Sequence, residues 1–174
     1  VNITIANVII QNYSIGMLFN ATNDSFVYKG TFIRNNHSGV ELRTSLFNNI
    51  LDSKFHENTN GLVLNPGADR NIVSNFTAQN NTNAALLVNR SLVDGFINLF
   101  TRNNTYGVYF APGTTDAQLS EAFLELGTFG LYLNGSSSNS FGTVHATNNT
   151  NGVYFYNSSS NTFSDGNSSF NTQN

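Results

Sequence analysis

A glycine returns at an almost constant interval through this chain of 174 residues. Neighbouring positions in the series are 22 or 23 residues apart, and Ala84 stands where one glycine is missing. The series is Gly16, Gly39, Gly61, Ala84, Gly107, Gly130 and Gly152. A fixed period of this length indicates a repeat architecture in which each unit packs only against its neighbours. The interval therefore predicts a solenoid.

Apolar residues alternate with other residues after each glycine, as in the segments 130–134 and 152–156. This period of two is typical of a short strand with one face in the core. Two more apolar runs follow in each period, so we expect three short strands per repeat. Stacked about 4.8 Å apart, such repeats form a parallel β-helix. A leucine-rich repeat would need a leucine frame that is absent, and a β-sandwich would not keep one register through seven periods.

A column of asparagines precedes the glycines by three positions. Its members are Asn36, Asn58, Asn81, Asn104 and Asn149, and Gly127 takes the place of the sixth. Asparagine and glycine both tolerate positive φ, so the column predicts a tight corner in the left-handed conformation. Stacking would also align the side chains as asparagine ladders.

Two segments, 151–163 and 129–141, resemble the repeats of right-handed parallel β-helix proteins of the pectate-lyase-like and NosD-like group. The resemblance spans essentially the whole chain and is weakest at 83–94. It implies an all-β, right-handed, single-stranded parallel β-helix of about seven coils of 22–23 residues. We expect residues 1–174 to form one such domain, either a processed chain or a segment of a longer protein. Lyases, hydrolases, adhesins and surface-layer proteins share this architecture, so it does not fix a function.

The composition limits the kinds of partner and cofactor that the protein can bind. Only 10% of the residues are charged and the net charge is −3, so no basic face exists for nucleic acid. No apolar run is long enough to span a membrane, and there is no cysteine for disulfides or thiolate metal sites. We expect no cofactor.

Thirteen Asn-x-Ser/Thr sequons occur, about twice the roughly six expected by chance, and the excess favours an exported glycoprotein. They are Asn2, Asn12, Asn20, Asn23, Asn36, Asn75, Asn80, Asn89, Asn103, Asn134, Asn148, Asn157 and Asn167. The alternative is that Asn-Asn-Thr is only the corner of the repeat. Two glycans at Asn80 and Asn103, on adjacent coils, would crowd each other.

An apolar stripe stands two positions after each glycine, on the face expected to be polar. It consists of Leu18, Glu41, Val63, Leu86, Tyr109, Tyr132 and Tyr154. The three tyrosines are predicted to stack on consecutive coils. They would form a platform for sugar rings, a contact with a neighbouring subunit, or a ladder that only stabilises the sheet.

Catalytic and metal-binding patterns are missing. The acidic residues are scattered, and Asp94 lies near Asp116 on neighbouring coils with no base beside them. His37, His56 and His145 show no ligand spacing, so a copper role implied by the NosD resemblance has no residues to support it. We therefore predict that the protein is not an enzyme.

The sequence predicts an extracellular or cell-surface structural protein. The given residues contain no recognisable cap for either end of the repeat, so the ends would be covered by sequence outside this segment or by another molecule. We expect the second, with head-to-tail self-assembly into a filament, sheath or surface layer. The interface candidates are Val1, Ile3, Ile5, Tyr109, Tyr132, Tyr154 and Phe170. A carbohydrate-binding or carbohydrate-cleaving β-helix is the alternative, and an adhesin segment is a further one.

Overall fold

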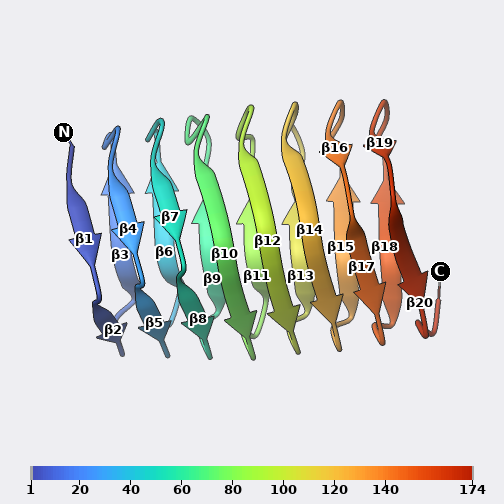
Figure 1. Cartoon of the computed structure of the whole chain (residues 1–174), viewed down its shortest axis with the longest axis horizontal. Coiled ribbons are helices and arrows are strands. Elements are labelled where there is room, and N and C mark those ends of the chain that lie inside the picture. Colours follow the sequence, from blue (N-terminus) through green and yellow to red (C-terminus); the bar gives the residue numbers. More distant parts are fainter. Residues whose placement is uncertain (1, 174) are drawn as a thin grey trace.

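Twenty strands build the described part of the chain, residues 2–173 of this computed structural model, and all of their pairings are parallel (Figure 1). Within these residues no helix is long and apolar enough to cross a bilayer. The chain forms a β-solenoid, as the glycine interval predicted.

One sheet has seven strands, one from each coil. Its members are β3 (Ile15–Asn20), β6 (Ser38–Arg43), β9 (Asn60–Leu64), β11 (Ala84–Val88), β13 (Tyr106–Phe110), β15 (Phe129–Asn134) and β18 (Asn151–Tyr156). Six of these strands carry the repeated glycine as their second residue, and β11 has none, so the period of the sequence is the period of this sheet.

The other sheet has thirteen strands and wraps the rest of each coil. In the first three coils it contains β1 (Thr4–Ala6), β2 (Ile9–Gln11), β4 (Phe26–Tyr28), β5 (Thr31–Ile33), β7 (Asn49–Leu51) and β8 (Lys54–His56). Further along it contains β10 (Ile72–Gln79), β12 (Gly95–Arg102), β14 (Gln118–Glu125), β16 (Ser140–Phe141), β17 (Val144–Thr147), β19 (Thr162–Phe163) and β20 (Gly166–Ser169). The expected three strands per coil thus merge into two where β10, β12 and β14 run through the corner.

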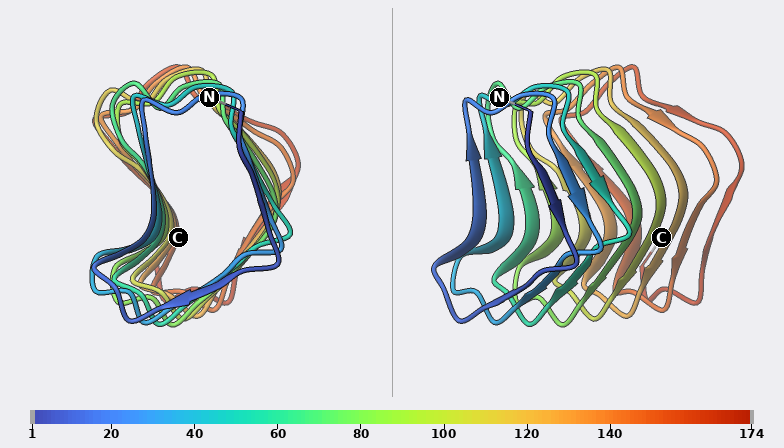
Figure 2. Two further views of the ribbon diagram at one scale, coloured as in Figure 1. Left: turned by 90° about the vertical axis from the view of Figure 1, so that its left-hand side faces the viewer. Right: turned by 60° about the vertical axis from the view of Figure 1, so that its left-hand side comes forward.

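The helix is right-handed, because the chain runs clockwise as it recedes from its N-terminal end (Figure 2). Seven coils close, and β19 and β20 begin an eighth. This confirms the fold predicted from the sequence. Figure 2 also shows that the seven-stranded sheet bends inward, so its outer side is concave.

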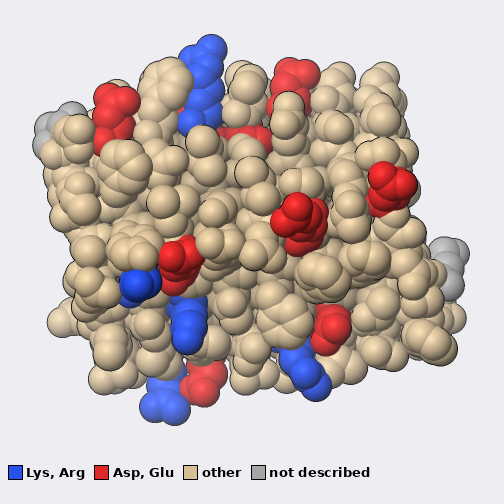
Figure 3. Space-filling view, viewed as in Figure 1, with Lys and Arg blue, Asp and Glu red and all other residues tan. Residues whose placement is uncertain are grey.

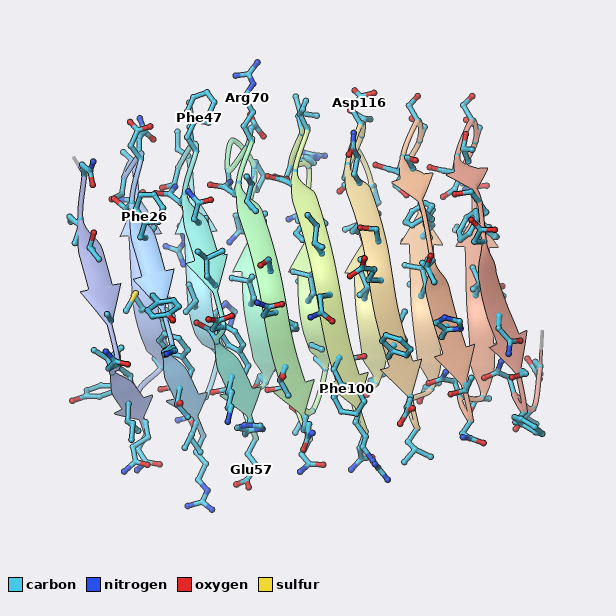
Figure 4. The ribbon with its side chains drawn as sticks, viewed as in Figure 1. Phe26, Phe47, Glu57, Arg70, Phe100 and Asp116 are labelled. Atoms are coloured by element: carbon cyan, nitrogen blue, oxygen red, sulfur yellow. The ribbon has the colours of Figure 1, made fainter. Side chains whose placement is uncertain are left out.

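The core is one continuous column of side chains inside the coils. Phe55 is fully buried, with its ring centroid 5.1 Å from that of Phe32 and 4.9 Å from that of Phe76. On β4 the buried residue is Val27, whereas its neighbour Phe26 points outward (Figure 4). Equivalent phenylalanines thus stack on one another in the core. Near a corner, however, the structure decides which of two neighbouring residues faces inward.

The glycine column follows the bend of the seven-stranded sheet. A Cβ at Gly130 would lie 2.6 Å from the carbonyl oxygen of Gly152 on the next coil, so the close approach of two backbones excludes a side chain there. The member that lacks glycine is Ala85, not Ala84 as predicted, because Leu86 pairs with both Leu62 and Val108. Leu87 rather than Leu86 therefore belongs to the outward stripe.

The asparagine column is a buried amide ladder, and the backbone explanation of it was wrong. Positive φ falls one residue earlier, at Arg34, Glu57, Asn80, Asn103, Leu126, Asn148 and Phe170. The column itself begins at Asn35, not Asn36, and Asn58 and Asn81 are about 1–2% exposed. Each amide accepts from one coil and donates to the next, as in Asn58 Nδ2 to Asn81 Oδ1 at 3.1 Å. These asparagines are selected by side-chain hydrogen bonding between coils.

Candidate functional site

The three predicted tyrosines stack on the concave outer side of the seven-stranded sheet. Tyr109 pairs with Tyr132, and Tyr132 pairs with Tyr154, in the register of β13, β15 and β18. Their ring centroids are 5.0 and 5.5 Å apart. Tyr109 and Tyr132 are half-buried, and Tyr154 is exposed.

Two further aromatic residues join this stack, and sequence reasoning missed them. Tyr106 and Phe129 precede the glycines of β13 and β15, and their rings are nearly parallel at 5.2 Å. Tyr106 also stacks on Tyr109 at 5.0 Å, although residues three apart in a flat strand lie on opposite faces. The bend at the glycine brings them together. The signal in the sequence was an aromatic residue just before the glycine on two adjacent coils.

We call Tyr106, Tyr109, Phe129, Tyr132 and Tyr154 the aromatic ladder. Stacked rings cover one another's faces, so the ladder presents ring edges rather than a flat platform. Burial raises the pKa of the Tyr132 phenol, and the nearby phenols of Tyr109, Tyr106 and Tyr154 raise it further. Asn134 Nδ2 donates to the Tyr109 hydroxyl at 3.2 Å. The ladder thus groups hydroxyls and an amide along an apolar band.

A shallow groove of about 540 Å³ follows the corner next to this ladder. Its lining residues are Asn80, Asn81, Thr82, Asn103, Asn104, Thr105, Leu126, Gly127 and Thr128. None of them is charged. Asn103 Nδ2 donates to Asn80 Oδ1 at 2.9 Å, and Thr105 Oγ1 donates to the Thr82 carbonyl at 2.9 Å. Thr105 and Thr128 directly precede Tyr106 and Phe129, so the uncharged lining of the groove adjoins the ladder along the chain.

A charged cluster occupies the N-terminal end of the same sheet. Glu41 is 2% exposed and stands in the column that Tyr109 occupies later. Its Oε1 accepts from Arg43 Nε and from Asn65 Nδ2, both at 2.6 Å, and its Oε2 lies 3.5 Å from His37 Nε2. A buried carboxylate of this kind needs such partners. Asn65 follows β9, so its bond to Glu41 holds β6 to the turn after β9.

The histidines and acidic residues do not gather into a metal site. Among the described residues there is no group of three or more His, Cys, Asp or Glu side chains placed to hold a metal ion. His37 faces Glu41 on β6, while His145 stacks on Phe123 at 5.0 Å on the other sheet. Burial lowers the pKa of His56, and Lys54 lowers it further.

The predicted end-to-end interface is not tested by the structure. Val1 lies outside the described residues. Ile3 is 40% exposed and Phe170 is 85% exposed, while Ile5 packs against the core. Self-assembly through these residues stays a prediction.

All thirteen sequon asparagines are at least partly accessible. Asn23, Asn89 and Asn134 are partly buried, and the others are exposed. The buried amides of the ladder, such as Asn81 and Asn104, are the middle residues of sequons rather than acceptors. The fold is therefore compatible with the predicted glycosylation and does not test it.

In a host that glycosylates sequons, we expect no chain to carry glycans at both Asn80 and Asn103. The two residues lie on adjacent coils about 4.8 Å apart, and their amides already bond to each other. Cleavage after Glu57 and Glu121 releases residues 58–121 as one peptide for mass spectrometry. Asn75 and Asn103 lie at different corners, so this control pair can be doubly occupied. A peptide with glycans at both Asn80 and Asn103 would contradict the expectation.

Comparison with known proteins agrees with this architecture. A family model described as "Periplasmic copper-binding protein (NosD)" matches residues 1–121. The crystal structure of a double mutant of the periplasmic alginate epimerase AlgG is similar in fold, with a TM-score of 0.68 at 14% sequence identity. The similarity covers 95% of this chain but 42% of that one, so the chain spans less than half the length of that protein. No curated protein sequence matches the chain.

Proposed function

Because the chain belongs to the NosD family, whose model matches 121 of its 174 residues, we propose that it is part of an exported envelope β-helix protein that binds glycans. The binding surface is the corner groove together with the aromatic ladder. The ligand is an extended, uncharged glycan chain that lies along the helix axis.

The uncharged character of this surface carries the proposal. The groove offers amides and hydroxyls, and the ladder adds ring edges and phenol hydroxyls. Such groups complement sugar hydroxyls and leave no buried charge to neutralise. The scattered charged side chains of the opposite, thirteen-stranded face contrast with it (Figure 3).

The repeat of the helix supports the direction of the ligand. Equivalent groups recur once per coil, about every 4.8 Å, which is close to the length of one sugar residue in an extended chain. Asn80 and Asn103 are one such pair, and Thr82, Thr105 and Thr128 are another set. A chain along the axis would therefore meet the same contacts again at each sugar.

The copper in the family's description does not fit the described residues. Copper sites use clustered imidazole, thiolate or thioether ligands. This chain has three histidines, one methionine and no cysteine. His37 lies just before β6 of the seven-stranded sheet, whereas His145 is on β17 of the thirteen-stranded sheet. Within residues 2–173 no group of three or more His, Cys, Asp or Glu side chains is placed to hold a metal ion. We therefore assign no copper chemistry to this segment.

An envelope location follows the descriptions of the similar proteins, both of which are called periplasmic. The sequon excess is in keeping with export. That the protein is not an enzyme also stays part of the proposal, because Glu41 is 2% exposed and is already bonded to Arg43 and Asn65.

Replacing Tyr109, Tyr132 and Tyr154 together by phenylalanine is expected to weaken glycan binding at least tenfold. The substitution keeps the stacked rings and removes three hydroxyls, each of which contributes about 1 kcal/mol through a hydrogen bond. Calorimetric titration with soluble xylan, β-glucan and dextran, and with alginate as the acidic counterpart, measures the change.

Tyr28→Phe is the matched control, because Tyr28 is 37% exposed on β4 of the other sheet. It should bind as the wild type does, and the thermal midpoint of the triple variant should stay within a few degrees. Equal affinity of the triple variant and the wild type would contradict the proposed surface. A preference for alginate would contradict the uncharged ligand.

A further inference from the structure

A second amide ladder lines the corner that precedes the thirteen-stranded sheet. Asn48, Asn71 and Asp94 are successive rungs of its first run, Ala117 interrupts it, and Asn139 and Asn161 continue it. In this ladder Asn48 Nδ2 donates to the Asn71 side-chain oxygen at 3.1 Å, and Asn71 Nδ2 also donates to the Ser45 carbonyl at 3.1 Å. The amide nitrogen of Asn71 thus satisfies a backbone carbonyl, and its amide oxygen accepts from the neighbouring asparagine.

Asp94 keeps the accepting half of this pattern. Its Oδ1 accepts from the Asn71 backbone N–H at 2.8 Å and from Asn71 Nδ2 at 3.4 Å. The carboxyl has no N–H for the donating half, although Asp94 is only 1% exposed. The carbonyl that an amide at this rung would reach is that of Ala68, one coil on from Ser45.

Ser91 fills the missing place. Its hydroxyl contacts both the Ala68 carbonyl oxygen and Asp94 Oδ2. One hydroxyl carries one proton and can donate to only one of these two oxygens. Both contacts are hydrogen bonds only if Asp94 Oδ2 carries a proton and donates it to Ser91 Oγ, which then donates to Ala68. A neutral Asp94 completes the ladder as asparagine does elsewhere.

We propose that Asp94 is a proton-dependent rung between two turns on adjacent coils, the β9–β10 turn and the β11–β12 turn. It holds them together when its carboxyl is neutral and loosens this contact when the carboxyl is ionised. Loss of the proton leaves either the Ala68 carbonyl or one carboxylate oxygen without a donor in a buried place. A buried oxygen without a hydrogen-bond donor destabilises the folded state, so the segments 65–71 and 89–94 would open more often.

The surroundings favour the neutral form. Burial raises the pKa of Asp94 to about 7, the bonds from Ser91 and Asn71 oppose this rise, and the negative charge of Asp69 adds to it. Arg70 and Asp116 line a cavity of about 320 Å³ together with Asp94, and Arg90 lies in the same turn as Asp94. Figure 4 shows Arg70 and Asp116 at this same edge of the helix. The cavity gives protons a path to the carboxyl.

The sign of the effect follows from linkage. The folded-state pKa lies above the unfolded value of 3.8, so the folded protein binds the extra proton between these two values. Stability is therefore full below about pH 4 and falls as the pH rises to about 7. A difference of about three pKa units corresponds to a change of up to roughly a thousandfold in the unfolding constant.

Denaturant unfolding of the full chain from pH 4 to pH 9 tests this proposal. We expect the wild type to lose stability between pH 4 and 7, and Asp94→Asn to lack that slope and to be the more stable protein at pH 8. Asp116→Asn is the control, because Asp116 is exposed with φ of 57°, which asparagine tolerates. It should keep the wild-type slope.

Carbon-13 NMR of the Asp94 carboxyl gives a direct reading, and hydrogen exchange of residues 65–71 and 89–94 reports the opening. We expect titration near pH 7 and at least tenfold faster exchange of these segments at pH 8 in the wild type than in Asp94→Asn, compared at one pH. Titration below pH 5, or an Asp94→Asn profile with the wild-type slope, would overturn the proposal.

Discussion

Replacing Phe55 by alanine is expected to destabilise the solenoid by about 3–5 kcal/mol, the usual cost of removing a buried aromatic ring. Phe55 is 0% exposed and stacks between Phe32 and Phe76, so the cavity would open inside three successive coils. The flanking rings are held by their own strands and cannot fill it. Urea unfolding followed by circular dichroism measures the change.

Phe26→Ala is the matched control, because Phe26 is 39% exposed and points outward from β4. Its loss should cost less than about 1 kcal/mol. In a solenoid each coil contacts only its neighbours, so the Phe55 variant should also unfold less cooperatively, with the N-terminal coils leaving first. Similar costs for the two variants would show that the Phe55 column does not support the core.

Replacing Asn81 by alanine is expected to cost about 2–6 kcal/mol, even though it removes no apolar contact. Asn81 Oδ1 accepts from the Asn58 backbone N–H at 3.0 Å, and Asn81 Nδ2 donates to the Phe55 carbonyl at 3.2 Å. Both of those groups belong to buried residues and would lose their partner, and each unsatisfied group costs about 1–3 kcal/mol. The same urea experiment measures it.

Thr82→Ala controls for a change at the same corner, since Thr82 is exposed and its side chain faces solvent. Asn81→Asp separates the two halves of the amide, because it keeps the acceptor and loses the donor. We expect the aspartate variant to gain stability on acidification, as Asp94 is proposed to do. An alanine variant as stable as Thr82→Ala would mean that the ladder is not needed for folding.

The aromatic ladder could be predicted only in part. Tyr109, Tyr132 and Tyr154 share one position in the repeat, and a shared position in a solenoid means a shared column. Tyr106 and Phe129 could not be added, because their place depends on a bend that the alternation of residues does not report. The same bend turns a stripe of separate side chains into a packed group of ring edges.

Sequence alone determined the period, the inward face of most strands in the seven-stranded sheet and the stacking of equivalent residues, because a repeat that recurs in every coil fixes these features locally. Tertiary structure decided which of two neighbours at a corner turns inward, as with Asn80 and Asn81, since the left-handed residue is set by how the chain closes each coil. It also decided that Ser91 reaches both Asp94 and Ala68. These contacts join different coils, and no pattern within one coil specifies them.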